Sequence, residues 1–167
     1  MSTQETTTIE AVRRSVTVDR PVEEAFATFT ERIHEWWPLA THSIDHYETG
    51  TAAETVVFQG GAGGQLFERT KKGEELKWAD VVAYDPPHRF VLAWDPPARF
   101  VMSWYPGKDD SQATELEVRF TAEGSGTRVD LEHRGWARLG DEAAEARRSY
   151  NEGWEPVLRA YAEKASE

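Results

Sequence analysis

The sequence predicts an α+β fold, and two observations support this prediction. Short apolar runs separated by turn signals fill the middle of the chain, a pattern typical of an antiparallel meander. The chain then closes with one long amphipathic stretch whose apolar residues recur at three- and four-residue spacing, which indicates a helix with one apolar face. Because such a helix must bury that face, we expect a curved antiparallel sheet to wrap around it.

The N-terminal part of the chain predicts one strand and two short helices. Residues 12–18 are rich in β-branched side chains and indicate a strand. Pro21 suits the first turn of a helix, and the apolar spacing after it predicts a helix that ends near Glu31. We expect a second short turn or helix to carry the adjacent residues Trp36 and Trp37.

The meander is predicted from seven further apolar runs, which are separated by segments rich in glycine, proline or aspartate. Strict alternation of charged and apolar residues makes the sixth run the clearest half-buried strand. The predicted strands span residues 55–59, 65–70, 76–84, 89–94, 100–105, 115–120 and 127–133.

The C-terminal helix is predicted from about Asp141 to Lys164, with Asp141 as its N-cap. At roughly 1.5 Å per residue it is long enough to cross a domain. Gly153 and Pro156 interrupt the pattern, so we expect a kink near them. Its apolar face consists of Ala143, Ala146, Tyr150, Trp154, Val157, Leu158 and Tyr161.

Length and composition indicate a single domain of residues 9–167 behind a disordered tail of residues 1–8. The polar N-terminus and the absence of cysteine predict a cytoplasmic protein without a signal peptide. A formal net charge of -11 disfavours nucleic acid and membrane surfaces as partners. The oligomeric state is left open.

Four segments resemble the START-like, or SRPBCC, superfamily: residues 14–38 (RSVTVDRPVEEAFATFTERIHEWWP), 63–68, the turn and strand that end at His133, and 153–158. Within it they look most like the branch named after the C-terminal domain of the activator of Hsp90 ATPase. Similar segments occur in the calicheamicin self-resistance protein, an enediyne-binding member. The resemblance implies a helix-grip (Bet v 1/START-like) fold with a cavity between the sheet and the long helix.

That cavity, together with the seven tryptophans, predicts binding of a hydrophobic, aromatic or polycyclic small molecule, for which the resemblance implies sequestration or resistance. No metal or organic cofactor is expected. The alternatives are an enzyme of the polyketide cyclase or dehydratase type and an Hsp90 cochaperone. We do not expect the last, because the chain is similar only to the activator's C-terminal domain.

The predicted ligand-binding residues are aromatic or apolar side chains of the strands and helices, plus one histidine. For each tryptophan, packing in the core is the competing interpretation. The predicted set is Trp36, Trp37, Phe58, Phe67, Trp78, Phe90, Met102, Trp104, Leu116, His133, Trp136, Tyr150 and Trp154.

His133 shares the apolar face of its strand, so it is either a polar anchor for a ligand or a buried neutral histidine with a hydrogen-bonding neighbour. We favour the second. Glu68, Asp80 and His133 are the acid–base candidates if the protein is an enzyme, although alternation does not settle which way the two carboxylates face.

Two motifs are interpreted as structural. Residues 60–64, a glycine-rich run, lack the Gly-Lys-Ser/Thr ending of a phosphate loop and precede no helix, so a turn is expected. His42, Asp45 and His46 have no convincing further ligand nearby, so no zinc site is predicted there.

Overall fold

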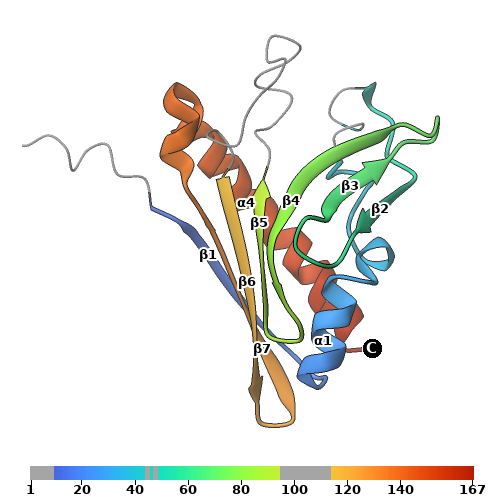
Figure 1. Cartoon of the computed structure of the whole chain (residues 1–167), viewed down its shortest axis with the longest axis vertical. Coiled ribbons are helices and arrows are strands. Elements are labelled where there is room, and N and C mark those ends of the chain that lie inside the picture. Colours follow the sequence, from blue (N-terminus) through green and yellow to red (C-terminus); the bar gives the residue numbers. More distant parts are fainter. Residues whose placement is uncertain (1–9, 44–45, 47–48, 95–113) are drawn as a thin grey trace, which may run out of the picture.

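A seven-stranded antiparallel sheet curves around the C-terminal helix in the computed structural model (Figure 1). The structure describes residues 10–43, 46, 49–94 and 114–167. The strands follow one another in the order β1-β7-β6-β5-β4-β3-β2. Their bounds are β1 Val12–Val18, β2 Thr55–Phe58, β3 Gln65–Arg69, β4 Glu75–Asp85, β5 Arg89–Trp94, β6 Thr114–Glu123 and β7 Gly126–Arg134.

This architecture confirms the predicted α+β helix-grip fold. The first strand joins the last one, and β2 to β7 form the meander in chain order. The run predicted as a strand at 100–105 and the predicted tail at 1–8 lie outside the described residues. The assignment of 9–167 to one domain stays a prediction.

The described helices include two short ones near the N-terminus and a long one at the C-terminus. Both N-terminal helices precede the meander, as predicted, but the first ends at Phe29, two residues before the predicted end. The bounds are α1 Val22–Phe29, the 3₁₀ helix η2 Ile33–Glu35, the 3₁₀ helix η5 Trp136–Glu142 and α4 Ala143–Ala165.

The prediction that Asp141 is the N-cap of the long helix is wrong. Asp141 lies within η5, and α4 begins at Ala143 after Glu142, which makes no side-chain cap hydrogen bond. The physical reason is Gly140, whose φ of 64° is a left-handed conformation that glycine tolerates. The Gly140 carbonyl accepts a hydrogen bond from the Ala143 N–H, so a 3₁₀ turn leads into the helix without a side-chain cap.

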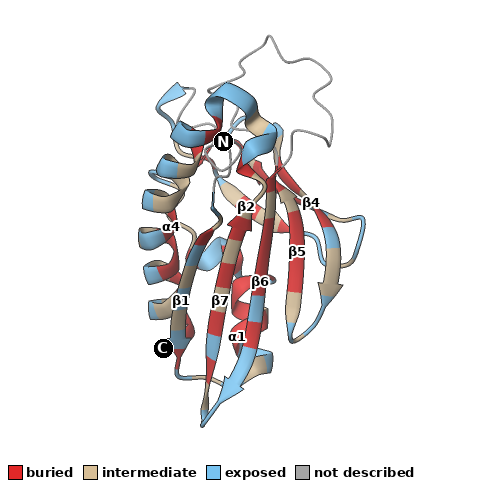
Figure 2. Cartoon of the chain, turned by 90° about the vertical axis from the view of Figure 1, so that its left-hand side faces the viewer, coloured by how far each residue is buried: buried red, intermediate tan, exposed pale blue. Residues whose placement is uncertain are grey.

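α4 lies along the sheet beside β1 and is tied to it by side chains (Figure 2). Arg147 Nε donates to the Glu10 carbonyl, 2.7 Å away, just before β1 begins. Arg14 donates to the Asn151 carbonyl at 2.7 Å, and the Asp19 N–H donates to Ser166 Oγ at 3.3 Å. These contacts hold the helix against the strand at the beginning, middle and end of β1.

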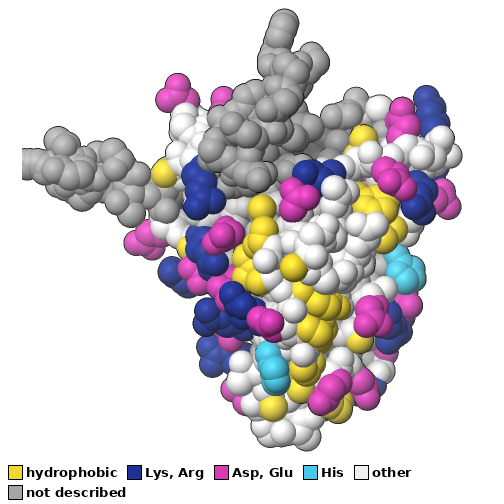
Figure 3. Space-filling model, in the orientation of Figure 1, with side chains coloured by type: hydrophobic (Ala, Val, Ile, Leu, Met, Phe, Trp, Pro, Cys, Tyr) yellow, Lys and Arg dark blue, Asp and Glu magenta, His cyan; other side chains and the backbone are white. Residues whose placement is uncertain are grey.

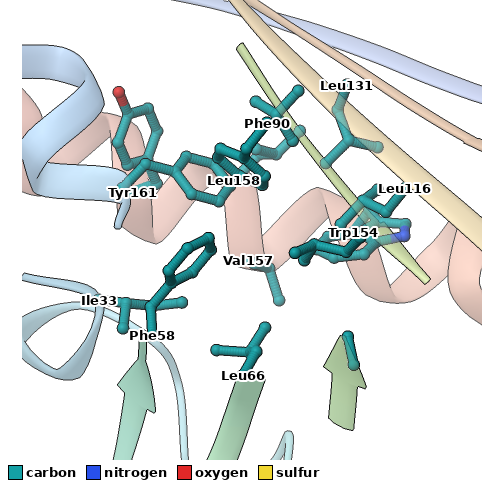
Figure 4. Packing of buried hydrophobic residues seen from close by; sticks show 14 of the residues in the cluster. Ile33, Phe58, Leu66, Phe90, Leu116, Leu131, Trp154, Val157, Leu158 and Tyr161 are labelled. Atoms are coloured by element: carbon teal, nitrogen blue, oxygen red, sulfur yellow. The ribbon is translucent and has the colours of Figure 1, made fainter. Parts of the chain in front are cut away.

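The core lies between α4 and the inner face of the sheet (Figure 4). Val157 and Leu158 of α4 point toward the sheet, where Leu66 and Leu116 project from β3 and β6. α4 remains helical through Gly153 and Pro156, so these residues do not end it, and the expected kink stays a prediction. The predicted apolar face of the helix is confirmed, since all its residues except the half-buried Tyr150 are buried.

The opposite, outer face of the sheet carries an ion-pair network centred on Glu117. Its side chain is only 6% exposed and accepts hydrogen bonds from Arg89 Nε at 2.7 Å, Arg119 Nε at 2.8 Å and Arg134 Nη1 at 2.9 Å. These guanidinium groups lower the pKa of Glu117 to about 2, against the opposing effect of burial. Figure 3 shows basic and acidic side chains side by side on the left of the molecule.

Candidate functional site

The aromatic side chains inside the fold form two connected clusters. In the phenylalanine cluster, neighbouring rings lie 4.8 to 6.3 Å apart, centroid to centroid. It comprises Phe26, Phe29, Trp36, Phe58, Tyr84, Phe90, Phe120 and Tyr161. The tryptophan cluster comprises Trp37, Trp78, Trp94, His133, Trp136, Tyr150 and Trp154.

The two clusters meet at the adjacent residues Trp36 and Trp37, whose ring centroids lie 5.7 Å apart. Trp36 packs on Phe29 and Tyr161 and donates its indole N–H to the Thr28 carbonyl. Trp37 instead contacts the tryptophan cluster and is only partly buried. The competing interpretation of each tryptophan, packing in the core, therefore applies to Trp36, whereas Trp37 contacts the tryptophan cluster.

Four tryptophans contact one another in a closed circuit, which we call the tryptophan tetrad: Trp37, Trp78, Trp94 and Trp154. The centroid distances are 4.9 Å for Trp37–Trp78, 6.1 Å for Trp78–Trp94, 5.6 Å for Trp94–Trp154 and 6.0 Å for Trp154–Trp37. Such spacings are typical of aromatic rings in direct contact. The tetrad brings β4, β5, α4 and the segment after η2 together at one place.

Every indole N–H of the tetrad already has an acceptor inside the protein. Trp78 donates to Glu68 Oε1 at 2.7 Å, and Trp94 donates to the Tyr150 hydroxyl at 3.0 Å. Trp154 donates to Nδ1 of His133, and Trp37 donates to a main-chain carbonyl of its own segment. The polar edges of the four indoles are therefore all occupied by acceptors within the protein.

His133 is completely buried and holds β6, β7 and α4 together at the tetrad. Nδ1 accepts the Trp154 N–H at 3.1 Å, and Nε2 lies 2.8 Å from Thr114 Oγ1. Burial, with a smaller effect of the neighbouring Arg134, lowers the pKa of His133 to about 3. The residue is thus a neutral histidine that carries its hydrogen on Nε2 and donates it to Thr114, which is the arrangement favoured from the sequence.

The two candidate carboxylates have different environments. Glu68 is 0% exposed and lies on the same face of β3 as Leu66, beside Trp78. Asp80 is partly exposed and pairs with Lys77 Nζ at 2.8 Å. Only Glu68 therefore reaches the tryptophan cluster.

The structure brings some of the predicted ligand-binding residues together and separates others. Those in the tryptophan cluster are Trp37, Trp78, His133, Trp136, Tyr150 and Trp154. Those in the phenylalanine cluster are Trp36, Phe58 and Phe90. Leu116 is buried on β6 opposite His133 of β7.

Three predicted residues have no described place at this site. Phe67 pairs with Val57 and Lys77 on the face of β3 opposite Leu66, and the Arg69 guanidinium lies 5.7 Å from its ring centroid. Met102 and Trp104 lie outside the described residues.

The predicted set lacked two residues that the structure places at the site. Trp94 belongs to the tetrad, and Thr114 is a partner of His133. Alternation could have found both, since Trp94 follows Phe90 by four residues and Thr114 precedes Leu116 by two, which puts each on the inner face of its strand.

The structural interpretation of the glycine-rich run is confirmed. It connects β2 to β3, and the Gly63 N–H donates to the Val81 carbonyl at 2.9 Å while the Val81 N–H donates to Gly64. The part of the chain that the structure describes contains no group of three or more side chains placed to hold a metal ion. None of the helices in that part has the length and apolarity to cross a bilayer.

Comparison with known proteins finds similar solved structures, some at 30% identity or more and others that share only the fold. The anthrahydroquino-gamma-pyrone synthase Txn09, complexed with SUM, is 33% identical at a TM-score of 0.63, with 94% of this chain and 97% of that chain covered. The self-sacrificing resistance protein CalC from Micromonospora echinospora is 30% identical at a TM-score of 0.63, with 93% and 94% covered. The Aha1 dimer from Colwellia psychrerythraea, at 12% identity, a TM-score of 0.61 and coverage of 95% and 97%, shares the fold.

No curated protein matches the sequence. A family model described as activator of Hsp90 ATPase homolog 1-like protein matches residues 19–163, which include every element from α1 to most of α4. Together with the solved structures, this match confirms the resemblance to the START-like, or SRPBCC, superfamily. The chain belongs to the family of activator of Hsp90 ATPase homolog 1-like proteins.

Proposed function

We propose that the protein binds a hydrophobic, aromatic or polycyclic small molecule at the tryptophan cluster and sequesters it. The observation that carries this proposal is the tetrad itself, in which four indoles contact one another while all their N–H groups are bonded within the protein. Ring faces without free donors favour flat apolar guests, which gain dispersion and aromatic contacts. The proposed contacts in the described residues are Trp37, Trp78, Trp94, Tyr150 and Trp154.

Charge narrows the proposed ligand class to neutral or weakly cationic molecules. The chain carries a net charge of -11, and Glu68 lies buried at the edge of the tetrad. An anionic ligand would meet repulsion from both. The relatives support the proposal, since one is described as a synthase of an anthrahydroquinone-type product and another as a resistance protein. The likeness to Aha1 is one of fold at 12% identity, so we do not propose Hsp90 as a partner.

Calorimetric titration with a neutral aromatic tricycle, 1,8-dihydroxyanthraquinone, tests the proposal. We expect a dissociation constant in the micromolar range, on the order of -8 kcal/mol of binding free energy. Trp154→Phe should weaken binding, whereas Phe67→Leu, on the other face of β3, should leave it unchanged. Absence of binding up to the solubility limit of the dye, together with no retained molecule in native mass spectra of freshly purified protein, would refute the function.

A second candidate function, proton transfer on a bound polyketide in the manner of a cyclase, is favoured by the buried carboxylate of Glu68 beside Trp78. His133 is a poorer proton carrier, because both its ring nitrogens are engaged and its pKa is lowered to about 3. Deuterium uptake at C10 of anthrone in D₂O measures such transfer. If the protein is an enzyme of this type, it accelerates the uptake and Glu68→Gln abolishes the acceleration; a pure binding protein leaves the rate unchanged.

A further inference from the structure

We propose that Trp37 is the displaceable wall of the tetrad, and that the site selects flat aromatic ring systems because its guest takes the place of the Trp37 indole against Trp78 and Trp154. This inference rests on the proposed function and adds to it the way in which the ligand enters and the ligand shape that the site accepts.

The other three walls of the tetrad are fixed to the frame of sheet and helix. Trp78 of β4 is bonded to a side chain of β3, Trp94 of β5 to a side chain of α4, and Trp154 of α4 to a side chain of β7. Each of these hydrogen bonds therefore links two different elements. All three indoles are at least nine-tenths buried. Moving any of them would separate neighbouring strands or lift α4 from the sheet.

Trp37 is held differently. It follows η2 and belongs to neither a strand nor a long helix, and it is only partly buried. Its indole N–H donates to the His42 carbonyl at 2.7 Å, and the His42 N–H donates to the Pro38 carbonyl at 2.8 Å. These two bonds lie within residues 37–42. The Trp37 main-chain N–H also donates to the Ile33 carbonyl at 3.0 Å, so the segment is fixed at its first residue and moves as one unit about that end.

The neighbours of this segment favour such a shift. Trp36, directly before it, is anchored in the phenylalanine cluster and bonded to the Thr28 carbonyl, so it provides a fixed pivot. At the other end the His42 imidazole lies over Gly153 of α4, where a Cβ atom would be 3.8 Å from Nε2. Because glycine has no side chain, the segment meets a smooth part of the helix there.

The geometry of the vacated space sets the ligand shape. The Trp37 ring centroid lies 4.9 Å from that of Trp78 and 6.0 Å from that of Trp154. Withdrawal of Trp37 leaves a space one aromatic ring thick, bounded by Trp78 and Trp154, with Trp94 in contact with both. A flat ring system restores the lost contacts by stacking, whereas a saturated skeleton is thicker and has no π face.

The test compares 1,8-dihydroxyanthraquinone with testosterone, a tetracycle that has no aromatic ring and is almost fully saturated, on the full chain. Calorimetry gives affinities, and stopped-flow absorbance of the dye gives its association rate constant. We expect the wild-type protein to prefer the dye by about tenfold or more, and Trp37→Ala to speed its association by about tenfold, because a wall no longer has to move before binding. The preference over testosterone should shrink in the same variant.

Two further variants keep the test decisive. Trp37→Phe loses the bond to the His42 carbonyl but keeps an aromatic wall, so association should be faster while the preference for the dye remains, even if Trp37→Ala folds poorly. Trp78→Phe alters a fixed wall, so it should weaken binding of the dye without raising its association rate constant. Suppose that the wild type binds the dye while both Trp37 variants show the wild-type association rate constant and the wild-type preference for the dye over testosterone. That result overturns the displacement of Trp37 and leaves the binding function standing. If the wild type binds neither molecule, both fall.

Discussion

The indole N–H of Trp154 donates to Nδ1 of His133 across 3.1 Å, which joins the middle of α4 to the end of β7 inside the protein. The imidazole passes its own hydrogen on to Thr114 of β6. One buried chain of donors and acceptors thus connects the helix with two strands beside the proposed ligand site. A hydrogen bond to a completely buried acceptor is costly to leave unmade.

Trp154→Phe isolates that hydrogen bond, because it keeps an aromatic ring but removes the donor. We expect it to lower the free energy of unfolding by about 1–3 kcal/mol, since Nδ1 of His133 is left without its donor. Trp154→Ala also empties a buried site and should cost about 3–5 kcal/mol. Urea denaturation measures both, with the exposed neighbour Glu155→Ala as control. Wild-type stability in both Trp154 variants would show that the packing of α4 described above is wrong.

Acid should destabilise the protein already between pH 6.5 and 5. The pKa of His133 in the folded protein lies below its ordinary value of 6.5, at about 3, because of burial. As the pH falls through 6.5, the unfolded chain therefore binds a proton that the folded protein excludes. The free energy of unfolding then drops by up to about 1.4 kcal/mol per pH unit. Burial also lowers the pKa of His42, which adds in the same direction.

Denaturation midpoints across this pH range measure the effect, and His133→Gln should give a shallower slope. The range stays above the window in which Glu35 and Glu117, with pKa values lowered to about 2, lose their contributions. An identical slope in the variant, or an NMR titration of His133 near pH 6.5, would contradict the neutral assignment.

Glu117→Gln tests the outer face independently of the ligand site. The carboxylate is buried among three arginines, of which Arg119 is exposed and the other two are partly exposed, so we expect a loss of about 1–2 kcal/mol at pH 7. The pKa of Glu117 is lowered to about 2, so its contribution is present above pH 4.5 and is lost as the pH falls toward 2. The difference from wild type should shrink over that window, and affinity for the dye should not change. A loss that persists at pH 2 would assign the effect to packing.

Metal chelators should leave the melting temperature unchanged. The sequence has no cysteine, and its His42–His46 pair has no convincing further ligand. Differential scanning calorimetry with and without EDTA measures this. A clear fall in EDTA that is reversed by zinc would reveal a structural metal.

The sequence predicted most of the fold, because alternation and helical spacing are local. The run at 115–120 alternates as a half-buried strand does, and the apolar residues of α4 recur at the three- and four-residue spacing of a helix. The start of α4 was missed because Gly140 inserts a 3₁₀ turn before the helix, and neither spacing nor composition distinguishes an N-cap at Asp141 from that turn.

The candidate site was harder to predict, since it depends on which distant residues meet. Alternation could not decide that Glu68 faces inward, because its strand is apolar on both faces; the register with β2 and β4 decides it. For the same reason Phe67 could not be separated from the inward-facing aromatic residues. The division of Trp36 and Trp37 between two clusters follows from η2, which is too short to present a helical face.

The contacts that hold α4 along β1 also affect how copies of the protein meet. β1 is an edge strand, and an exposed edge is a template for strand addition and aggregation. Here Arg147 already binds the carbonyl of Glu10 before the strand, and Ser166 already binds the N–H of Asp19 after it. The opposite edge, β2, is only four residues long. The residues that flank β1 and the shortness of β2 thereby limit how far another chain could extend the sheet at either border.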